Sequence, residues 1–202
     1  MITNEAGLEA WICDNQIEFI AALRYSLDVP MEYKIHFVGR QITIGKENRL
    51  DLLYYFDFPT DKKIEGKDDG YVRAFIVVEL KFRELKVSDL AQLGRYMNAI
   101  ECTDGHQDEQ TAWRITTCGV LVGDGVESDL DKIVDTHLLN RRRFAILDVS
   151  ENLSFDYYDP FNDDAPETAD KRFIKALIAP WEKEEVEDEP ERIPEDSQET
   201  EE

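Results

Sequence analysis

The spacing of apolar residues changes along the chain, and each spacing predicts a type of element. A repeat of three to four residues predicts helices over residues 4–25 and 88–101. Alternating or nearly continuous apolar runs predict strands, the continuous ones being typical of strands buried on both faces. The predicted strands are residues 32–44, 49–56, 71–81, 112–122 and 144–149. Weaker patterns add helices over 127–139 and 171–178 and an edge strand over 153–161.

These elements follow one another in the order α-β-β-β-α-β-(α)-β, which indicates a mixed α/β domain. A chain of 202 residues with 42% hydrophobic content can bury one good core, so we expect a single domain over residues 1–180. Residues 57–70 are polar and contain two glycines and a proline, which predicts a hairpin loop between the second and third strands. Antiparallel pairing across this hairpin would set Asp51 within reach of Glu79.

The third predicted strand, Phe-Ile-Val-Val-Glu-Leu-Lys over residues 75–81, ends in two opposite charges. Because side chains alternate along a strand, Glu79 and Lys81 project from one face while Val78 and Leu80 project from the other. Burying both charges is costly unless they meet a metal ion, a partner or a substrate. This strand end is therefore a candidate site, and a structural ion pair at a sheet edge is the alternative.

A single acidic residue, Asp51, interrupts the second apolar strand, Arg-Leu-Asp-Leu-Leu-Tyr-Tyr-Phe over residues 49–56. A carboxylate inside such a strand needs a hydrogen bond, a cation or a metal ion. Asp51 is therefore a second candidate site residue.

The charge balance limits which partners the protein can attract. The chain holds 45 acidic and 23 basic residues, a net charge of −22. Residues 182–202 hold 12 acidic and 2 basic side chains, and we interpret 181–202 as a disordered acidic tail. That tail accounts for −10, which leaves −12 on the rest of the chain. A body this acidic argues against broad electrostatic attraction to nucleic acid.

Cysteine and histidine usage excludes two classes of protein. The three cysteines, Cys13, Cys102 and Cys118, are too few for a disulfide framework, and no CxxC or histidine cluster suggests structural zinc. No apolar run approaches the roughly 18 residues that span a bilayer, and the N-terminus lacks a signal-peptide pattern. We therefore expect a cytoplasmic protein with no membrane contact.

Taken together, Asp51 in one strand, Glu79-Leu80-Lys81 at the end of the next and Gln92 on the following helix resemble the PD-(D/E)xK nuclease superfamily. An ExK sequence alone occurs often by chance. Joined to Asp51, to the Gln-x-x-x-Tyr pattern of Gln92 and Tyr96, and to the element order, it is much more specific. The chain departs from the pattern in having no proline before Asp51, a position that the superfamily holds loosely.

The resemblance covers roughly residues 4–122. Glu-Ala-Gly-Leu-Glu-Ala-Trp-Ile over residues 5–12 looks like the N-terminal acidic helix of the RecB-like and archaeal-type branches. The implied fold is α/β, a restriction-endonuclease-like αβββαβ core with a mixed central sheet flanked by helices. Dimers are common in such folds, so a homodimer is possible, although no residue marks an interface.

The resemblance also implies roles for the candidate residues. Asp51 and Glu79 would bind Mg²⁺ or Mn²⁺, because both ions favour hard oxygen ligands, and the Leu80 carbonyl would add a ligand. Glu5 would complete or orient this shell, or would simply be a first-turn acid that favours the helix dipole. Lys81 would orient the attacking water or stabilise developing negative charge. Gln92 would contact the substrate backbone or position Lys81.

A further group of residues would contact nucleic acid, and a solvated basic patch is the alternative for its arginines. These residues are Arg49, Arg95, Tyr96, Arg141, Arg142 and Arg143.

Two functions are compatible with the sequence. The first is a metal-dependent nuclease that hydrolyses phosphodiester bonds in DNA, including single-stranded or branched structures, in repair, recombination or defence. The second is a nuclease-like fold that no longer cuts and acts as a binding or assembly protein. The complete set of Asp51, Glu79, Lys81 and Gln92 favours the nuclease. The acidic body favours the second function, or else a narrow positive groove, a partner protein or a salt-rich cell.

Overall fold

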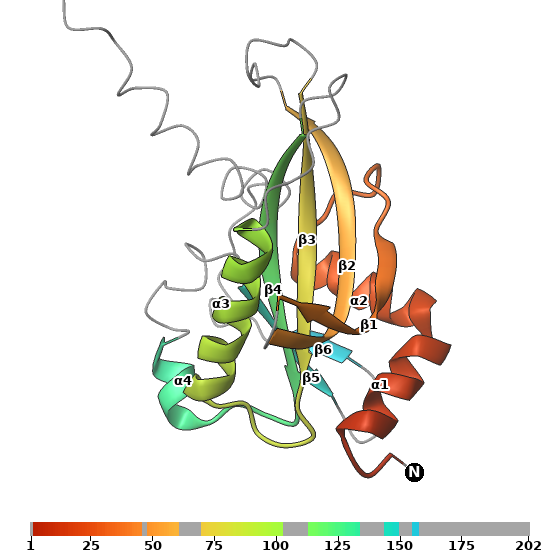
Figure 1. Cartoon of the computed structure of the whole chain (residues 1–202). Coiled ribbons are helices and arrows are strands. Elements are labelled where there is room, and N and C mark those ends of the chain that lie inside the picture. Colours follow the sequence, from red (N-terminus) through yellow and green to blue (C-terminus); the bar gives the residue numbers. More distant parts are fainter. Residues whose placement is uncertain are drawn as a thin grey trace, which may run out of the picture.

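The computed structural model describes residues 2–45, 48–60, 70–102, 113–133, 144–149 and 155–157. Its centre is a six-stranded mixed sheet with the strand order β1-β2-β3-β4-β5-β6 (Figure 1). The helices are α1 (Glu5–Asp14), α2 (Gln16–Ser26), α3 (Val87–Glu101) and α4 (Ser128–Ile133). The strands are β1 (His36–Ile44), β2 (Asn48–Thr60), β3 (Gly70–Leu80), β4 (Trp113–Gly123), β5 (Phe144–Val149) and β6 (Phe155–Tyr157).

The pairing changes direction at β3. β1, β2 and β3 form an antiparallel meander, whereas β3, β4 and β5 are parallel and β6 returns antiparallel to β5. Parallel neighbours need a crossover, and α3 supplies the one between β3 and β4. The carboxyl end of β3 therefore leads directly into the turn that begins α3.

Each face of the sheet is covered by its own apolar core. On one face, α1 and α2 pack Leu8, Ile12 and Phe19 against even-numbered strand residues such as Tyr54 and Val78. On the other face, α3 packs its own apolar side chains against odd-numbered residues of the same strands. The α3 residues are Leu93, Tyr96, Met97 and Ile100, and the strand residues include Leu53, Val77 and Leu121. Burial on both faces explains why β2 and β3 are almost continuously apolar.

The expected αβββαβ order and the mixed sheet flanked by helices are confirmed. The predicted helix over 4–25 is wrong in one respect, because it is two helices that meet at Asn15. The backbone of Asn15 leaves the helical region at φ −119° and ψ 47°, and its side-chain amide donates to the Trp11 carbonyl. This competition of an asparagine side chain for backbone groups ends α1.

Other boundaries also differ from the sequence expectation. β2 continues to Thr60, so the predicted loop over 57–70 is shorter than expected. The extra residues of β2 pair with β3 as far as Thr60 opposite Gly70, so the strand continues through Pro59. α3 begins at Val87, one residue earlier than expected, because the Asp89 carboxylate accepts a hydrogen bond from the Lys86 amide.

Several expectations fall wholly or partly outside the described residues. They are the second half of the 127–139 helix, the 171–178 helix, most of the 153–161 strand, the 181–202 tail and the arginine run 141–143. In the part of the chain that the structure describes, no helix is long and apolar enough to cross a membrane.

Candidate metal and nuclease site

Asp51 and Glu79 lie on neighbouring strands at one end of the β2–β3 pair. The antiparallel ladder ends with Leu52 opposite Val78, so Asp51 and Glu79 are the next residues beyond it on the two strands. The charge of Asp51 acts on Glu79 and raises its pKa, so the two carboxyl groups interact. The sequence expectation that the hairpin brings them within reach is confirmed.

Glu79 is the centre of the site. Its side chain is 2% exposed, and Oε1 accepts hydrogen bonds from Lys81 Nζ at 2.6 Å and Gln92 Nε2 at 2.7 Å. Its other oxygen, Oε2, is buried and has no hydrogen-bond partner among the residues that the structure describes. A buried carboxylate oxygen without a donor is costly, so this atom is an acceptor that a cation or a further donor could satisfy.

Burial and charge change the pKa of both strand-end groups. Burial, followed by the charge of Asp51, raises the pKa of Glu79 from 4.5 to about 7. Burial by itself would lower the pKa of Lys81, but its hydrogen bond to Glu79 and the surrounding negative charges outweigh burial and raise it. Lys81 is therefore a cation at neutral pH and suits a role as a charge stabiliser rather than as a base.

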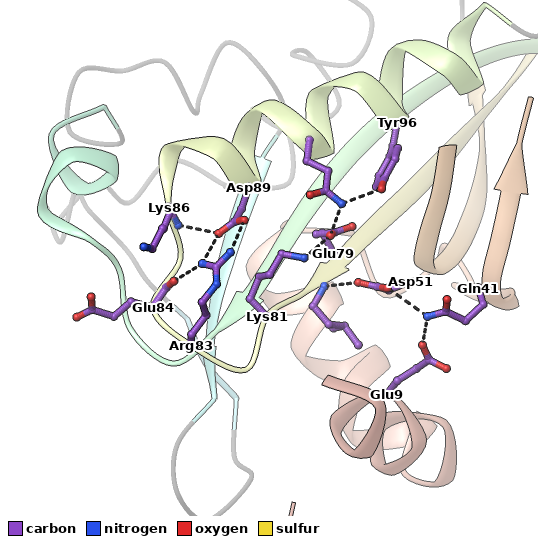
Figure 2. A network of polar contacts seen from close by, with 12 residues as sticks. Glu9, Gln41, Asp51, Glu79, Lys81, Arg83, Glu84, Lys86, Asp89 and Tyr96 are labelled. Carbon is purple, nitrogen blue, oxygen red and sulfur yellow. Dashed lines mark hydrogen bonds and ion pairs between the residues drawn. The ribbon is translucent and has the colours of Figure 1, made fainter. Parts of the chain in front are cut away.

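Asp51 is held at both of its oxygens. Oδ2 accepts from the Leu80 amide at 2.8 Å, and Oδ1 accepts from Gln41 Nε2 at 3.2 Å. Gln41 also donates to Oε2 of Glu9 on α1, so a chain of contacts runs from α1 through β1 to β2 (Figure 2). Burial raises the pKa of Asp51, although the Leu80 amide opposes this shift.

Sequence reasoning missed Glu9 and Gln41. Glu9 is 8% exposed and lies between the buried residues Leu8 and Ile12, so a buried acid on an apolar helix face was the signal that could have found it. Gln41 carries no such signal, because its contact depends on strand pairing. Glu5, the expected acid of this helix, is exposed, and its charge is one of those that raise the pKa of Lys81.

Gln92 and Tyr96 form the support behind Glu79. They are four residues apart on α3, and the Gln92 amide donates to both Glu79 and the Tyr96 hydroxyl, the latter at 2.7 Å. Tyr96 is 7% exposed and belongs to the core under α3. Its position behind Gln92 differs from the surface position that a nucleic-acid contact would need.

The segment after Lys81 is fixed by a forked ion pair. Arg83 donates from both terminal nitrogens to the two oxygens of Asp89, each at 2.8 Å, and also to the Glu84 carbonyl (Figure 2). The Lys81 amide donates to the Val122 carbonyl at 2.8 Å. These contacts tie the end of β3 to the start of α3, so Lys81 and Gln92 are held on adjacent rigid elements.

Exposed arginines surround this end of the sheet. Arg49 on β2 and Arg95 on α3 are exposed, as the sequence expectation requires of residues that meet nucleic acid. Arg40 on β1, which the sequence did not single out, has a 59% exposed side chain and lies 3.8 Å from Glu9. At 3.8 Å this ion pair is long, and the exposed Arg40 guanidinium can also reach other anions.

The donor set fits a hard divalent cation. In the described part of the chain, no group of three or more His, Cys, Asp or Glu side chains is placed to hold a metal ion. Asp51 and Glu79 would supply two carboxylates. Oε2 of Glu79 has no donor among the residues that the structure describes. Mg²⁺ is commonly bound by one or two carboxylates, with water and substrate phosphate completing its shell.

Neither the comparison with protein-family models nor that with curated proteins gives a match. Among solved structures, the chain is similar to a repair endonuclease from Pyrococcus abyssi, with 18% identity and a TM-score of 0.33 over 60% of this chain and 42% of that one. It is also similar to a chain of the EndoMS-dsDNA2 complex, with 17% identity and a TM-score of 0.35 over 67% and 45%. The chain thus spans less than half the length of either neighbour, and likeness this low transfers no function.

Proposed function

We propose that this protein is a metal-dependent nuclease that hydrolyses phosphodiester bonds in DNA. The observation that carries the proposal is the buried Glu79 carboxylate, which interacts with the charge of Asp51 on the neighbouring strand and keeps one oxygen without a donor among the described residues. Two carboxylates that interact in a partly buried site repel each other unless a cation or a proton lies between them. A divalent metal ion answers that need and can promote phosphodiester hydrolysis.

Asp51 and Glu79 would hold Mg²⁺ or Mn²⁺, with the Leu80 carbonyl as a further ligand. When bound, the ion would neutralise charge on the scissile phosphate and lower the pKa of an attacking water. Of the acids on α1, Glu9 is the one linked to Asp51, so we propose that it orients the shell, while Glu5 adds negative charge. The Leu80 amide already fixes Asp51, which pre-organises the site.

Lys81 would act as a cation beside the reacting phosphate. Its ammonium group is 2.6 Å from Glu79 Oε1 and its side chain is 11% exposed, so it is held in place and partly shielded from water. A fixed positive charge in such a place stabilises the negative charge that develops on a phosphate in the transition state. Gln92 would hold the Glu79 carboxylate in the orientation that leaves Oε2 free.

The substrate contacts would come from exposed arginines rather than from a broad basic surface. Arg40, Arg49 and Arg95 present guanidinium groups that suit phosphate oxygens. The net charge of −22 limits long-range attraction to DNA, so we expect binding that depends on these local contacts and on the metal ion.

Cleavage of labelled single-stranded, duplex and forked DNA with Mg²⁺ or Mn²⁺ tests the proposal. We expect cleavage that needs metal and falls at least about 100-fold in Glu79→Ala and in Lys81→Ala. Asp129→Ala and Lys132→Ala are matched controls, because these two residues also form an ion pair of an acid with a lysine, but an exposed one on α4. Equal activity in all four variants would refute the assignment of the site.

The acidic composition favours one other function, a nuclease-like fold that binds or assembles without cutting. Metal titration by calorimetry separates the two proposals when no DNA is cut. Metal binding that is lost in Asp51→Ala would point to a nuclease that lacks its substrate or partner. An absence of metal binding in the wild-type protein would support the non-catalytic function.

A further inference from the structure

Gln41 has an unusual backbone for its place in the fold. It lies within β1, yet its φ is +52°, in the left-handed region. Among the described residues, Asp28 is the other non-glycine residue with positive φ, and it follows α2 in a turn. Glycine adopts this conformation without strain and asparagine or aspartate tolerate it, whereas glutamine is not among the favoured residues. A strained residue in a strand persists only where its surroundings hold it.

The strained backbone places the Gln41 side chain at the candidate site. Arg40 pairs with Leu52 and Ile42 with Leu50, so Gln41 stands opposite Asp51 in the register. Its amide nitrogen donates to Oδ1 of Asp51 and to Oε2 of Glu9. Figure 2 shows the Gln41 amide between these two acids, with a dashed line to each.

The amide joins the two acids without adding charge. Ionised carboxylates only accept hydrogen bonds, so two of them cannot hydrogen-bond to each other and need a donor or a cation between them. An amide supplies two N–H groups and no charge, which leaves the negative charge of Asp51 and Glu9 available to a cation. Together with the Leu80 amide on Oδ2, the Gln41 amide fixes both oxygens of Asp51 and thus the plane of its carboxylate.

We propose that Gln41 is a positioning residue of the metal site, whose left-handed backbone aims its amide so that Asp51 and Glu9 are held together. This inference rests on the proposed function, because it assigns Gln41 to the orientation of a metal ligand. Partners that orient metal ligands typically change metal affinity by 10- to 100-fold when they are removed.

Two substitutions separate the amide from the backbone. Gln41→Ala removes the amide and keeps a Cβ in the strained conformation, whereas Gln41→Gly removes both the amide and the strain. We expect both variants to bind Mn²⁺ at least 10-fold more weakly than the wild-type protein in calorimetry. In metal-free buffer, we expect Gln41→Gly to melt at a higher temperature than Gln41→Ala. Asp28→Gly is the matched control, because it relaxes a left-handed residue outside the site and should leave Mn²⁺ affinity unchanged.

Kinetics supply a second readout that a purely structural role would not move. Because Gln41 acts through Asp51, the Gln41→Ala defect in DNA cleavage should shrink as the Mn²⁺ concentration rises, while the defect of Lys81→Ala should persist. A Gln41→Gly variant with wild-type Mn²⁺ affinity would overturn this inference and leave the nuclease proposal standing. A wild-type protein that neither binds Mn²⁺ nor cuts DNA would overturn both.

Discussion

A single carboxyl group, that of Glu79, links the stability of the protein to the chemistry that we propose for it. The groups that face it are Asp51 from β2, Lys81 just after the end of β3, and Asp89 and Gln92 from α3. Among the described residues, Lys81 and Gln92 are its donors, and both donate to the same oxygen. The result is a carboxyl group that takes up a proton more readily in the folded protein than in the unfolded chain.

This raised pKa predicts that the metal-free protein loses stability as the pH rises. Between about 4.5 and 7, the unfolded chain has released the Glu79 proton while the folded protein still holds it. The folded state therefore binds more protons, and stability falls by roughly 3 kcal/mol across this window. Urea unfolding in EDTA at pH 4 to 8 measures it. Glu79→Gln should flatten this part of the profile, and an unchanged profile would show that Glu79 titrates normally.

At the scale of elements, α3 is joined to β3 by the turn that carries Arg83 and Asp89. Asp89 is 3% exposed, and it accepts from Arg83 and from the Lys86 amide at the start of the helix. The same turn also pairs with the segment after β4, because Leu85 bridges to Val126. The start of α3 is therefore fixed from two directions, and with it the position of Gln92.

Replacing Asp89 with alanine should lower the free energy of unfolding by about 2 kcal/mol, because a helix cap and a forked ion pair are lost together. Burial would raise the pKa of Asp89, but hydrogen bonds from Arg83 and Lys86 lower it overall. Its stabilising effect is complete above pH 3.8 and is lost as the pH falls through the lowered pKa. Denaturant unfolding should therefore show that Asp89→Ala loses more free energy of unfolding, relative to the wild-type protein, at pH 7 than at pH 2. An equal loss at both pH values would contradict this account.

A substitution at Gly94, on the same helix, should raise the free energy of unfolding instead of lowering it. Gly94 lies inside α3, and a Cβ built on it would meet no atom within 4 Å. Gly94→Ala should therefore raise the free energy of unfolding by about 0.5–1 kcal/mol through helix propensity. Gly123→Ala is the contrasting variant, because its Cβ would lie 3.0 Å from the Arg83 carbonyl and 2.5 Å from Leu85 Cγ. Thermal unfolding of both variants should give shifts of opposite sign.

Most of this arrangement could be predicted from local patterns. The strands around Asp51 and Glu79 are long and apolar, and the polar loop between them indicated a hairpin, so their proximity followed. Glu9 and Gln41 could not be predicted in the same way. Glu9 meets Gln41 only after α1 packs on the sheet. The contacts of Gln41 depend on a left-handed backbone, which a glutamine in the sequence does not predict. The break at Asn15 was missed because the apolar repeat continues across it.

At the scale of the whole molecule, the excess of negative charge bears on the DNA binding that we propose. Residues 182–202 contribute −10 of the −22 net charge. Because like charges repel over about 10 Å in 0.1 M salt, an acidic segment near a DNA-binding face lowers the association rate and the affinity.

Deleting residues 182–202 should therefore strengthen DNA binding at low salt. We expect the truncated and full-length chains to differ most in 50 mM salt and to converge above about 0.5 M, where charges are screened. Fluorescence anisotropy with a labelled duplex in Ca²⁺, in place of Mg²⁺, measures this difference. Unchanged affinity at low salt would mean that the segment does not approach the bound DNA.

The irregular backbone of β1 has a consequence beyond the site. β1 is one edge of the sheet, and it carries exposed Phe37 and Val38, which a second chain could cover by adding a strand. The register shifts between Phe37 and Gly39, and Gln41 turns left-handed soon after. Such an edge presents no even row of donors and acceptors to a neighbour. The conformation that aims an amide at Asp51 therefore also protects the protein against edge-to-edge aggregation.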